Sequence, residues 1–456
     1  MIHKNKIENK KNRVLVLHRI PYHKIDYHLG FNEEDTEVTF FGKKTANESI
    51  PSLFGYQVVE RTEGKELVVD ALETFGEKSG FTHVFSLSEY ELLEAARLRE
   101  AWGISGASVG SVLKVRDKIL MKNAVKKANL RVPSYFTLLD FMQININKID
   151  ETMVKIDLEK EAQTPRWILK PISGASSENT RSFVSTNSLR EWVRDQLSPD
   201  EMENYEVEEF INQPIIHFDG IVERGKVKSC LKSRYFGMCL DYVNLGKPLG
   251  SYQCEMSLGE KEWVEQIVAA VEIKSGCFHL EAFEVPLETP SAKVFQDPES
   301  VAPPKHIFLE IANRVGGGEI AEVYKRATGI HLPSTEIKCL MGEPWNSNEV
   351  RSSSFYGFFV YPTHHLKGKE VRLVSRTKAH ESLPLFNQRL DFSVKNEKGQ
   401  PTFQAIESLA AGCFSADSEA QCQEILASLF EDLSVEEFEK NDHLGDEAHQ
   451  KWKEPK

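Results

Sequence analysis

Two short apolar segments, each carrying one glutamate, constrain the fold of this 456-residue chain more than any other feature. In FHLEAF (278–283), the two-residue period of a β-strand places His279 and Glu281 on one face. In IFLEIANR (307–314), the same period places Glu310 among apolar neighbours. A carboxylate within an apolar strand is costly unless a partner compensates its charge. The two segments therefore predict two strands that contribute to one polar site.

A hard cation such as Mg²⁺ is the usual partner of paired carboxylates, and it brings nucleotide phosphates with it. Arg314 and three glycines, Gly316 to Gly318, follow Glu310 at the end of its strand. A strand that ends in an arginine and continues into glycines can bring its backbone and a permanent positive charge close to a small ligand. Taken singly, Glu281 and Glu310 could be solvent-facing residues of an edge strand. The pair, together with Arg314 and the glycines, favours a binding site.

Two lysines lie where a phosphate could be bound. Lys170 ends the strand segment WILK and is followed by PISGASSENT, whose small residues offer backbone N–H groups and hydroxyls to a phosphate. Lys118 opens a helix for which Asp117 is the expected N-cap, and the helix dipole disfavours a cation there. The alternative for Lys118 is a solvated surface lysine. The chain has neither GxxxxGK[ST] nor a GxGxxG after its first strand, so a Walker A lysine is excluded.

Bulk properties exclude several classes of protein. A net charge of −13 disfavours nucleic-acid binding. No apolar run approaches the ~18 residues of a membrane span. The seven cysteines form no CxxC pair, which indicates reduced thiols in the cytoplasm. We therefore expect a cytoplasmic protein with small-molecule substrates, no nucleic-acid partner and no membrane partner, and a homodimer as the assembly.

The order of strand-like and helix-like segments divides the chain into three parts. RVLVLH (13–18) and THVFSL (82–87) predict strands of a doubly wound α/β domain over residues 1–115, with Ser88 and Glu91 as a capping box for the next helix. Residues 116–335 form the second part. Residues 336–456 are expected to form a small C-terminal α+β domain that ends in a polar tail.

Over about residues 82–332 the chain resembles the ATP-grasp superfamily. The resemblance rests on the order of DK, ILKP..GASS, VEEFI, HFDGIVERGKV, HLEAF and FLEIANRVGGGEI. The ending E-x-x-x-R before glycines is most similar to that of the L-amino acid ligases, which make dipeptides, with biotin-carboxylase-like members next. The resemblance implies an α/β (α+β) chain with an ATP-grasp fold. Its A subdomain would span about 116–204 and its B subdomain about 205–335.

The resemblance also implies roles for individual residues. Lys118 and Lys170 would contact the ATP phosphates, and Ser176 and Ser177 would belong to a mobile loop over them. Four consecutive residues would line the adenine and ribose pocket: Glu208, Glu209, Phe210 and Ile211.

The remaining roles concern metal and substrate. Glu281 and Glu310 would hold Mg²⁺ (or Mn²⁺). Arg314 would bind the substrate carboxylate or the phosphate it acquires, and Gly316, Gly317 and Gly318 would let backbone approach that group. His279 could donate a hydrogen bond to the reacting group. The chain departs from many members at Ala312, where they have asparagine, with Asn313 one residue later. This departure leaves the third metal ligand open. Glu209 stands where others often have lysine.

The implied activity is an ATP-dependent carboxylate–amine ligase. It would phosphorylate the carboxylate of an amino acid, or a similar small acid, and condense the acyl phosphate with an amine such as a second amino acid. Three alternatives remain open from the sequence. They are a biotin-carboxylase-like carboxylase, a non-catalytic ATP-binding sensor of the same fold, and a ligase acting on a polypeptide terminus or an unusual acid.

Overall fold

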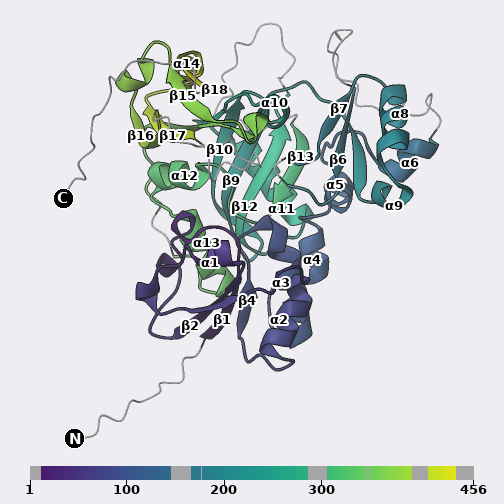
Figure 1. The fold of residues 1–456 in the computed structure, drawn as a ribbon, viewed down its shortest axis with the longest axis vertical. Helices are drawn as coiled ribbons and strands as arrows, with labels where there is room; N and C mark the ends of the chain where they lie inside the picture. Colours follow the sequence, from purple (N-terminus) through teal and green to yellow (C-terminus); the bar gives the residue numbers. More distant parts are fainter. Residues whose placement is uncertain are drawn as a thin grey trace, which may run out of the picture.

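The N-terminal part of the chain is built on a parallel four-stranded sheet, in the order β3-β2-β1-β4. The computed structural model describes residues 12–144, 166–175, 177–285, 306–346, 349–392 and 409–437. The strands are β1 (Asn12–His18), β2 (Thr36–Gly42), β3 (Gln57–Glu60) and β4 (His83–Phe85). Helices α2 (Leu67–Phe75) and α3 (Leu92–Trp102) pack on one face through Ala71, Ala95 and Leu98. The other face packs on Ile337 of α13 (Leu332–Leu340), which is far away in the sequence (Figure 1).

The expected capping box between Ser88 and Glu91 is wrong. The side chain of Ser88 makes no capping hydrogen bond, and a 3-10 turn over Glu89–Glu91 (η4) precedes α3. The carboxylate of Glu91 instead accepts hydrogen bonds from Ser86 and Arg61. Because the turn shifts the start of the α-helix to Leu92, the spacing of a capping box no longer fits.

An antiparallel eight-stranded sheet forms the centre of the molecule, in the order β13-β12-β9-β10-β11-β14-β17-β16. From the expected ATP-grasp region come β9 (Ile215–Glu223), β10 (Lys226–Phe236), β11 (Leu249–Cys254), β12 (Ser275–Phe283) and β13 (Ile307–Ala312). Arg224 and Gly225 both have positive φ (52° and 74°), so they form the tight turn between β9 and β10. One face of the sheet is apolar and packs on α5 (Lys118–Lys127) and α11 (Leu258–Ala270).

A smaller antiparallel sheet lies beside the central sheet, in the order β5-β8-β6-β7 (Figure 1). Its strands are β5 (Tyr135–Thr137), β6 (Trp167–Pro171), β7 (Arg181–Phe183) and β8 (Tyr205–Glu209). Helices α6 (Leu138–Gln143) and α8 (Thr186–Gln196) cover it around the buried Trp167, and α9 (Pro199–Met202) precedes β8. Strand β8 pairs with β5 and β6. By hydrogen bonding it therefore belongs to the sheet of the expected A subdomain, although the expected boundary near residue 205 places it in the B subdomain.

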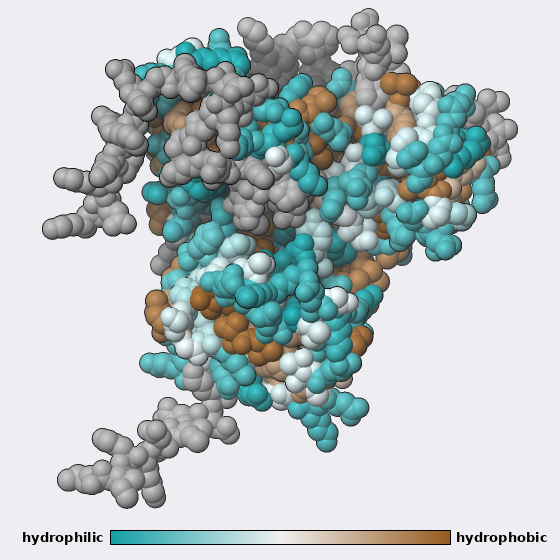
Figure 2. All heavy atoms as spheres, viewed as in Figure 1, coloured by the Kyte–Doolittle hydropathy of each residue, from teal (hydrophilic) through white to brown (hydrophobic). Residues whose placement is uncertain are grey.

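The C-terminal part continues the central sheet through β14 (Phe355–Tyr361), β16 (Leu385–Leu390) and β17 (Ala410–Ala416). Helix α14 (Glu419–Asp432) packs on these strands, and β15 (Val371–Ser375) pairs with β18 (Leu433–Glu437). The expected polar tail beyond residue 437 lies outside the described residues. Within the described ranges, no helix is long and apolar enough to cross a membrane. The face drawn in Figure 2 is largely hydrophilic, with separate apolar patches.

Candidate active site

A cavity of about 140 Å³, open to solvent, lies between the smaller sheet and the central sheet. One part is apolar and includes Ile168, Phe283 and Leu309. The other part carries charged side chains. The lining includes these residues expected from the sequence to bind nucleotide or metal: Lys118, Lys170, Ser177, Glu208, Glu209, Phe210, Ile211, Glu281 and Glu310.

Glu281 and Glu310 are direct partners in the register of β12 and β13. The hydroxyl of Tyr235 donates a hydrogen bond to Oε1 of Glu281 at 2.9 Å. Burial alone would raise the pKa of Glu281, but His279 and Tyr235 hold it below its ordinary value, so the carboxylate is ionised. The side chain of Glu310 is 34% exposed at the cavity. Two carboxylates on adjacent strands are the oxygen ligands that a hard divalent cation prefers.

Lys118 is buried, so the alternative of a solvated surface lysine is wrong. Asp117 caps its helix as expected, by accepting a hydrogen bond from the N–H of Leu120. The Nζ atom of Lys118 donates to the carbonyl of Gly174 at 2.7 Å and lies 3.6 Å from Glu310. The first turn of α5 therefore joins the small-residue loop to the carboxylate pair.

Lys170 belongs to a buried group of four charged side chains. Its Nζ lies 3.1 Å from Glu208 and 3.7 Å from Glu206, and Lys122 forms ion pairs with the same two carboxylates. Burial alone would lower the pKa of Lys170, but Glu208, Glu206 and Glu310 together raise it. Lys122 and Glu206 are not among the residues predicted from the sequence. The four-residue spacing from Lys118 and the two-residue spacing from Glu208 were the signals that could have identified them.

The small-residue loop follows β6 and contributes Gly174, Ala175 and Ser177 to the cavity. Ser177 has a φ of 56°, in the left-handed region that non-glycine residues rarely adopt. Ser176, expected in the same loop, lies outside the described residues. The loop also contacts the N-terminal domain, because the hydroxyl of Tyr90 donates to Glu178 at 3.2 Å.

The segment expected to bind adenine and ribose lines the cavity, but many of its polar groups already have partners. The carboxylate of Glu208 is bound by lysines, as described above. The N–H groups of Glu209 and Phe210 donate to the carbonyls of Ser134 and Arg166. Those two N–H groups are therefore engaged within the protein, and Phe210 and Ile211 offer the cavity mainly apolar surface.

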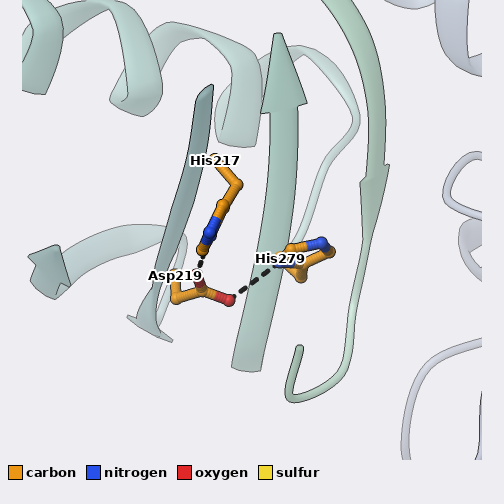
Figure 3. Close-up of side chains that lie close together, drawn as sticks. All are labelled: His217, Asp219 and His279. Atoms are coloured by element: carbon orange, nitrogen blue, oxygen red, sulfur yellow. Dashed lines mark hydrogen bonds and ion pairs between the residues drawn. The ribbon is translucent and has the colours of Figure 1, made fainter. Parts of the chain in front are cut away.

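A polar network continues from Glu281 across the central sheet through His279, Asp219 and His217, and Figure 3 shows these last three side chains. Asp219 accepts hydrogen bonds from Nδ1 of His217 at 2.6 Å and from Nδ1 of His279 at 2.9 Å. Nε2 of His279 lies 3.2 Å from Glu281, and Nε2 of His217 lies 2.6 Å from Ser251. Burial alone would lower the pKa of His279, but Asp219 and Glu281 raise it to about 10.

His217, Asp219 and His279 lie close enough together to hold a metal ion. However, each of the ring nitrogens and both oxygens of Asp219 already have a hydrogen-bonding partner. We therefore interpret this cluster as a hydrogen-bonded support for Glu281. His217 and Asp219 are not among the residues predicted from the sequence, although their alternation in IIHFDG is a signal for them.

The glycine run packs against this network. A Cβ on Gly316 would lie 2.6 Å from Oδ1 of Asp219 and 2.9 Å from Nδ1 of His279, so a larger residue does not fit there. Gly318 has a φ of 63°, which favours glycine, whereas a Cβ on Gly317 would meet no atom within 4 Å. The run thus brings backbone close to the polar network.

Arg314 and Asn313 both have partners away from the cavity lining. The guanidinium of Arg314 is bound by Glu89 of the N-terminal domain and by the carbonyl of Val315. The amide of Asn313 donates to the carbonyls of Ser275 and Cys277. Asn313 therefore holds the start of β12 and does not replace the asparagine that is absent at Ala312. Glu89 is not among the residues predicted from the sequence, because its partner lies 225 residues away.

This arrangement of sheets and cavity is the ATP-grasp fold, as the sequence resemblance implies. No family model matches the chain. It is 21% identical over 387 residues to an L-arginine-specific L-amino acid ligase of Bacillus subtilis, a match that covers 81% of this chain and 83% of the relative.

Solved structures show the same fold. An L-amino acid ligase from Bacillus licheniformis matches with a TM-score of 0.64 at 17% identity, covering 94% of this chain and 99% of the other. An N5-carboxyaminoimidazole synthase from Aspergillus clavatus, in complex with ADP and 5-aminoimidazole ribonucleotide, matches with a TM-score of 0.61 at 12% identity, covering 92% and 98%. The chain thus resembles the L-amino acid ligases within the ATP-grasp superfamily, in sequence as well as in structure.

Proposed function

We propose that this chain is an ATP-dependent ligase that joins the carboxylate of an amino acid, or of a similar small acid, to an amine. The second substrate is a further amino acid, and the products include ADP and phosphate. The observation that carries the proposal is the meeting of Glu281 and Glu310 in one cavity with Lys118 and Lys170. The matches to L-amino acid ligases support the choice of substrates.

The residues present fit a bound divalent cation and a triphosphate. Glu281 and Glu310 would hold Mg²⁺ or Mn²⁺, which neutralises phosphate charge and polarises the transferred group when bound. Lys118 and Lys170 would contact the phosphates, and the small-residue loop with Gly174, Ala175 and Ser177 would cover them. The apolar part of the cavity, with Ile168, Phe210 and Leu309, suits an adenine ring.

The reaction proceeds in two steps. An oxygen of the substrate carboxylate attacks the γ-phosphorus of ATP; a new O–P bond forms, the β–γ bridging bond breaks, and ADP leaves. The amine then attacks the acyl carbon, so that a C–N bond forms, phosphate leaves and the amine loses a proton. Arg314 is suited to binding the carboxylate or its phosphate, because its charge is permanent and its N–H groups form a planar fork. Exclusion of water by the loop would protect the acyl phosphate from hydrolysis.

The test is a phosphate-release screen of amino acids, alone and in pairs, with mass spectrometry of the products. We expect pairs to release phosphate and to yield a dipeptide. Lys170→Ala and Glu310→Ala should abolish ADP formation while the proteins stay folded by circular dichroism. Lys114→Ala, which removes a half-exposed lysine paired with Glu272, is the matched control and should stay active. Turnover retained in both site variants would refute the proposal.

Two outcomes would favour other functions. ADP formation that requires bicarbonate and biotin would indicate a carboxylase, and nucleotide binding without any substrate-dependent turnover would indicate a sensor. We also propose a cytoplasmic location. All seven cysteines are free thiols, as expected in a reducing compartment.

A further inference from the structure

Glu89 joins the N-terminal domain to Arg314. Its carboxylate accepts hydrogen bonds from Nε of Arg314 at 2.9 Å and from Nη2 at 2.5 Å. Nη1 of Arg116 donates to the other carboxylate oxygen at 2.5 Å. The three side chains are largely shielded from solvent, with exposed fractions of 13% for Glu89, 18% for Arg314 and 9% for Arg116. Charge-assisted hydrogen bonds of this kind are shorter and stronger than hydrogen bonds between neutral groups.

This contact leaves part of the Arg314 guanidinium available. The group has five N–H donors. Glu89 takes two of them, and the carbonyl of Val315 takes a third at 2.9 Å. As far as the described residues are concerned, two N–H groups therefore remain for a ligand, and Glu89 determines the direction in which they point. The residues after Val315 are glycines, so the chain next to Arg314 offers no other side chain to hold it.

The charges of Glu89 and its two arginine partners favour a fixed position for Arg314. Burial alone would raise the pKa of Glu89, but Arg314 and Arg116 lower it to about 2, so the carboxylate is ionised near neutral pH. One carboxylate shared by two guanidinium groups leaves a net positive charge. The carboxylates of Glu310 and Glu281 also act on Arg314 and raise its pKa. Arg116 further donates to the carbonyl of Ser173 at 2.6 Å, at the start of the small-residue loop. Through Arg314 and Arg116, Glu89 thus connects the end of β13 with the start of the small-residue loop.

We propose that Glu89 is a positioning residue, which holds Arg314 so that its two remaining N–H groups face the substrate carboxylate or the phosphate it acquires. The proposal rests on the proposed ligase function. Displacing a binding group by about 1 Å can lower the rate roughly 100-fold, so loss of this support should be visible in kinetics.

The experiment compares Glu89→Gln with Glu91→Gln. Glu91 is a buried glutamate two residues away that contacts Arg61 and Ser86 instead. We expect Glu89→Gln to lower kcat/KM for the acid substrate at least about tenfold while the Kd for Mg·ADP changes less than about twofold. Glu91→Gln should change neither. Glu89→Asp retains the charge but shortens the reach, and should show the same kinetic loss with a smaller change in melting temperature.

A double-mutant cycle tests the contact without relying on activity. If Glu89 and Arg314 are paired, the melting-temperature losses in Glu89→Gln and Arg314→Gln should not add in the double variant. Additive losses would overturn the proposal, as would wild-type kcat/KM in both Glu89 variants. If the wild-type protein forms no ADP with any acid tested, the proposed function fails, while the cycle still decides whether the pair exists.

Discussion

Replacing Glu336 with glutamine should make the protein more stable above neutral pH. Glu336 lies on α13 beneath the start of β12 and is only 3% exposed. Its carboxylate accepts a hydrogen bond from the N–H of Cys277. No salt bridge to Glu336 is present in the described part of the chain, and the nearby titratable groups are the thiols of Cys277 and Cys339. An ionised carboxylate at this position would therefore lack a compensating cation.

The size of the effect follows from the pKa. Burial raises the pKa of Glu336 from 4.5 to about 7, and the N–H of Cys277 opposes this only in part. The difference between 4.5 and about 7 corresponds to about 3 kcal/mol of folding free energy. Below 4.5, both the folded and the unfolded states are protonated and nothing is lost. Between the two values the unfolded state releases its proton first, so the free energy of unfolding falls as pH rises, and above 7 the loss is complete.

Urea unfolding of the wild type and Glu336→Gln, at about pH 4.5 and about pH 8, measures this difference. We expect the variant to gain up to about 3 kcal/mol relative to wild type at the higher pH and little at the lower pH. Glu265→Gln, at an exposed position on α11, controls for general charge effects. If the free energies of unfolding of the wild type and Glu336→Gln differed by the same amount at both pH values, the reasoning would be wrong.

Two further predictions concern the site. Gly316→Ala should lower ligase activity at least about tenfold, because its Cβ would displace Asp219 or His279. Gly317→Ala, where the Cβ would have no neighbour within 4 Å, is the control and should stay active in the same ADP assay. Tyr90→Phe removes the hydrogen bond to Glu178 and should raise the KM for ATP a few-fold. An unchanged KM would show that this contact does not hold the loop.

Local patterns predicted much of the fold and the centre of the site. Strand periodicity was sufficient to place Glu281 and Glu310 toward a common site, and the pairing of β12 with β13 makes them direct neighbours. The helix cap at Asp117 is also a local feature, and it is confirmed. Each of these predictions depends on residues that lie close together in the sequence or on the period of a single strand.

Contacts between distant segments were not predictable in this way. Glu89 meets Arg314 only because the N-terminal domain packs against the end of β13. The extension of the central sheet by β14 depends on its pairing with β11, about a hundred residues earlier in the chain. The apparent capping box at Ser88 fails because a 3-10 turn precedes α3, and the carboxylate of Glu91 instead contacts Arg61 on a different segment. A sequence pattern describes what a segment can do locally, whereas tertiary partners determine which option it takes.

The ion pairs in the cavity suggest that nucleotide and metal bind cooperatively. Lys118 lies 3.6 Å from Glu310, and Lys170 lies 3.1 Å from Glu208. A triphosphate that takes over Lys118 would leave Glu310 without its cation, which is unfavourable in a partly buried site unless a divalent metal replaces it. Since such coupling is reciprocal, ATP should also tighten metal binding by the same factor.

Calorimetry of ATP binding with and without Mg²⁺ measures this coupling, which we expect to be at least about tenfold. Glu310→Gln should reduce the coupling without weakening metal-free ATP binding, because its neutral amide needs no replacement cation. Glu265→Gln should leave both quantities unchanged. If Glu310→Gln kept the wild-type coupling, Glu310 would be neither the partner released by Lys118 nor the ligand of the metal.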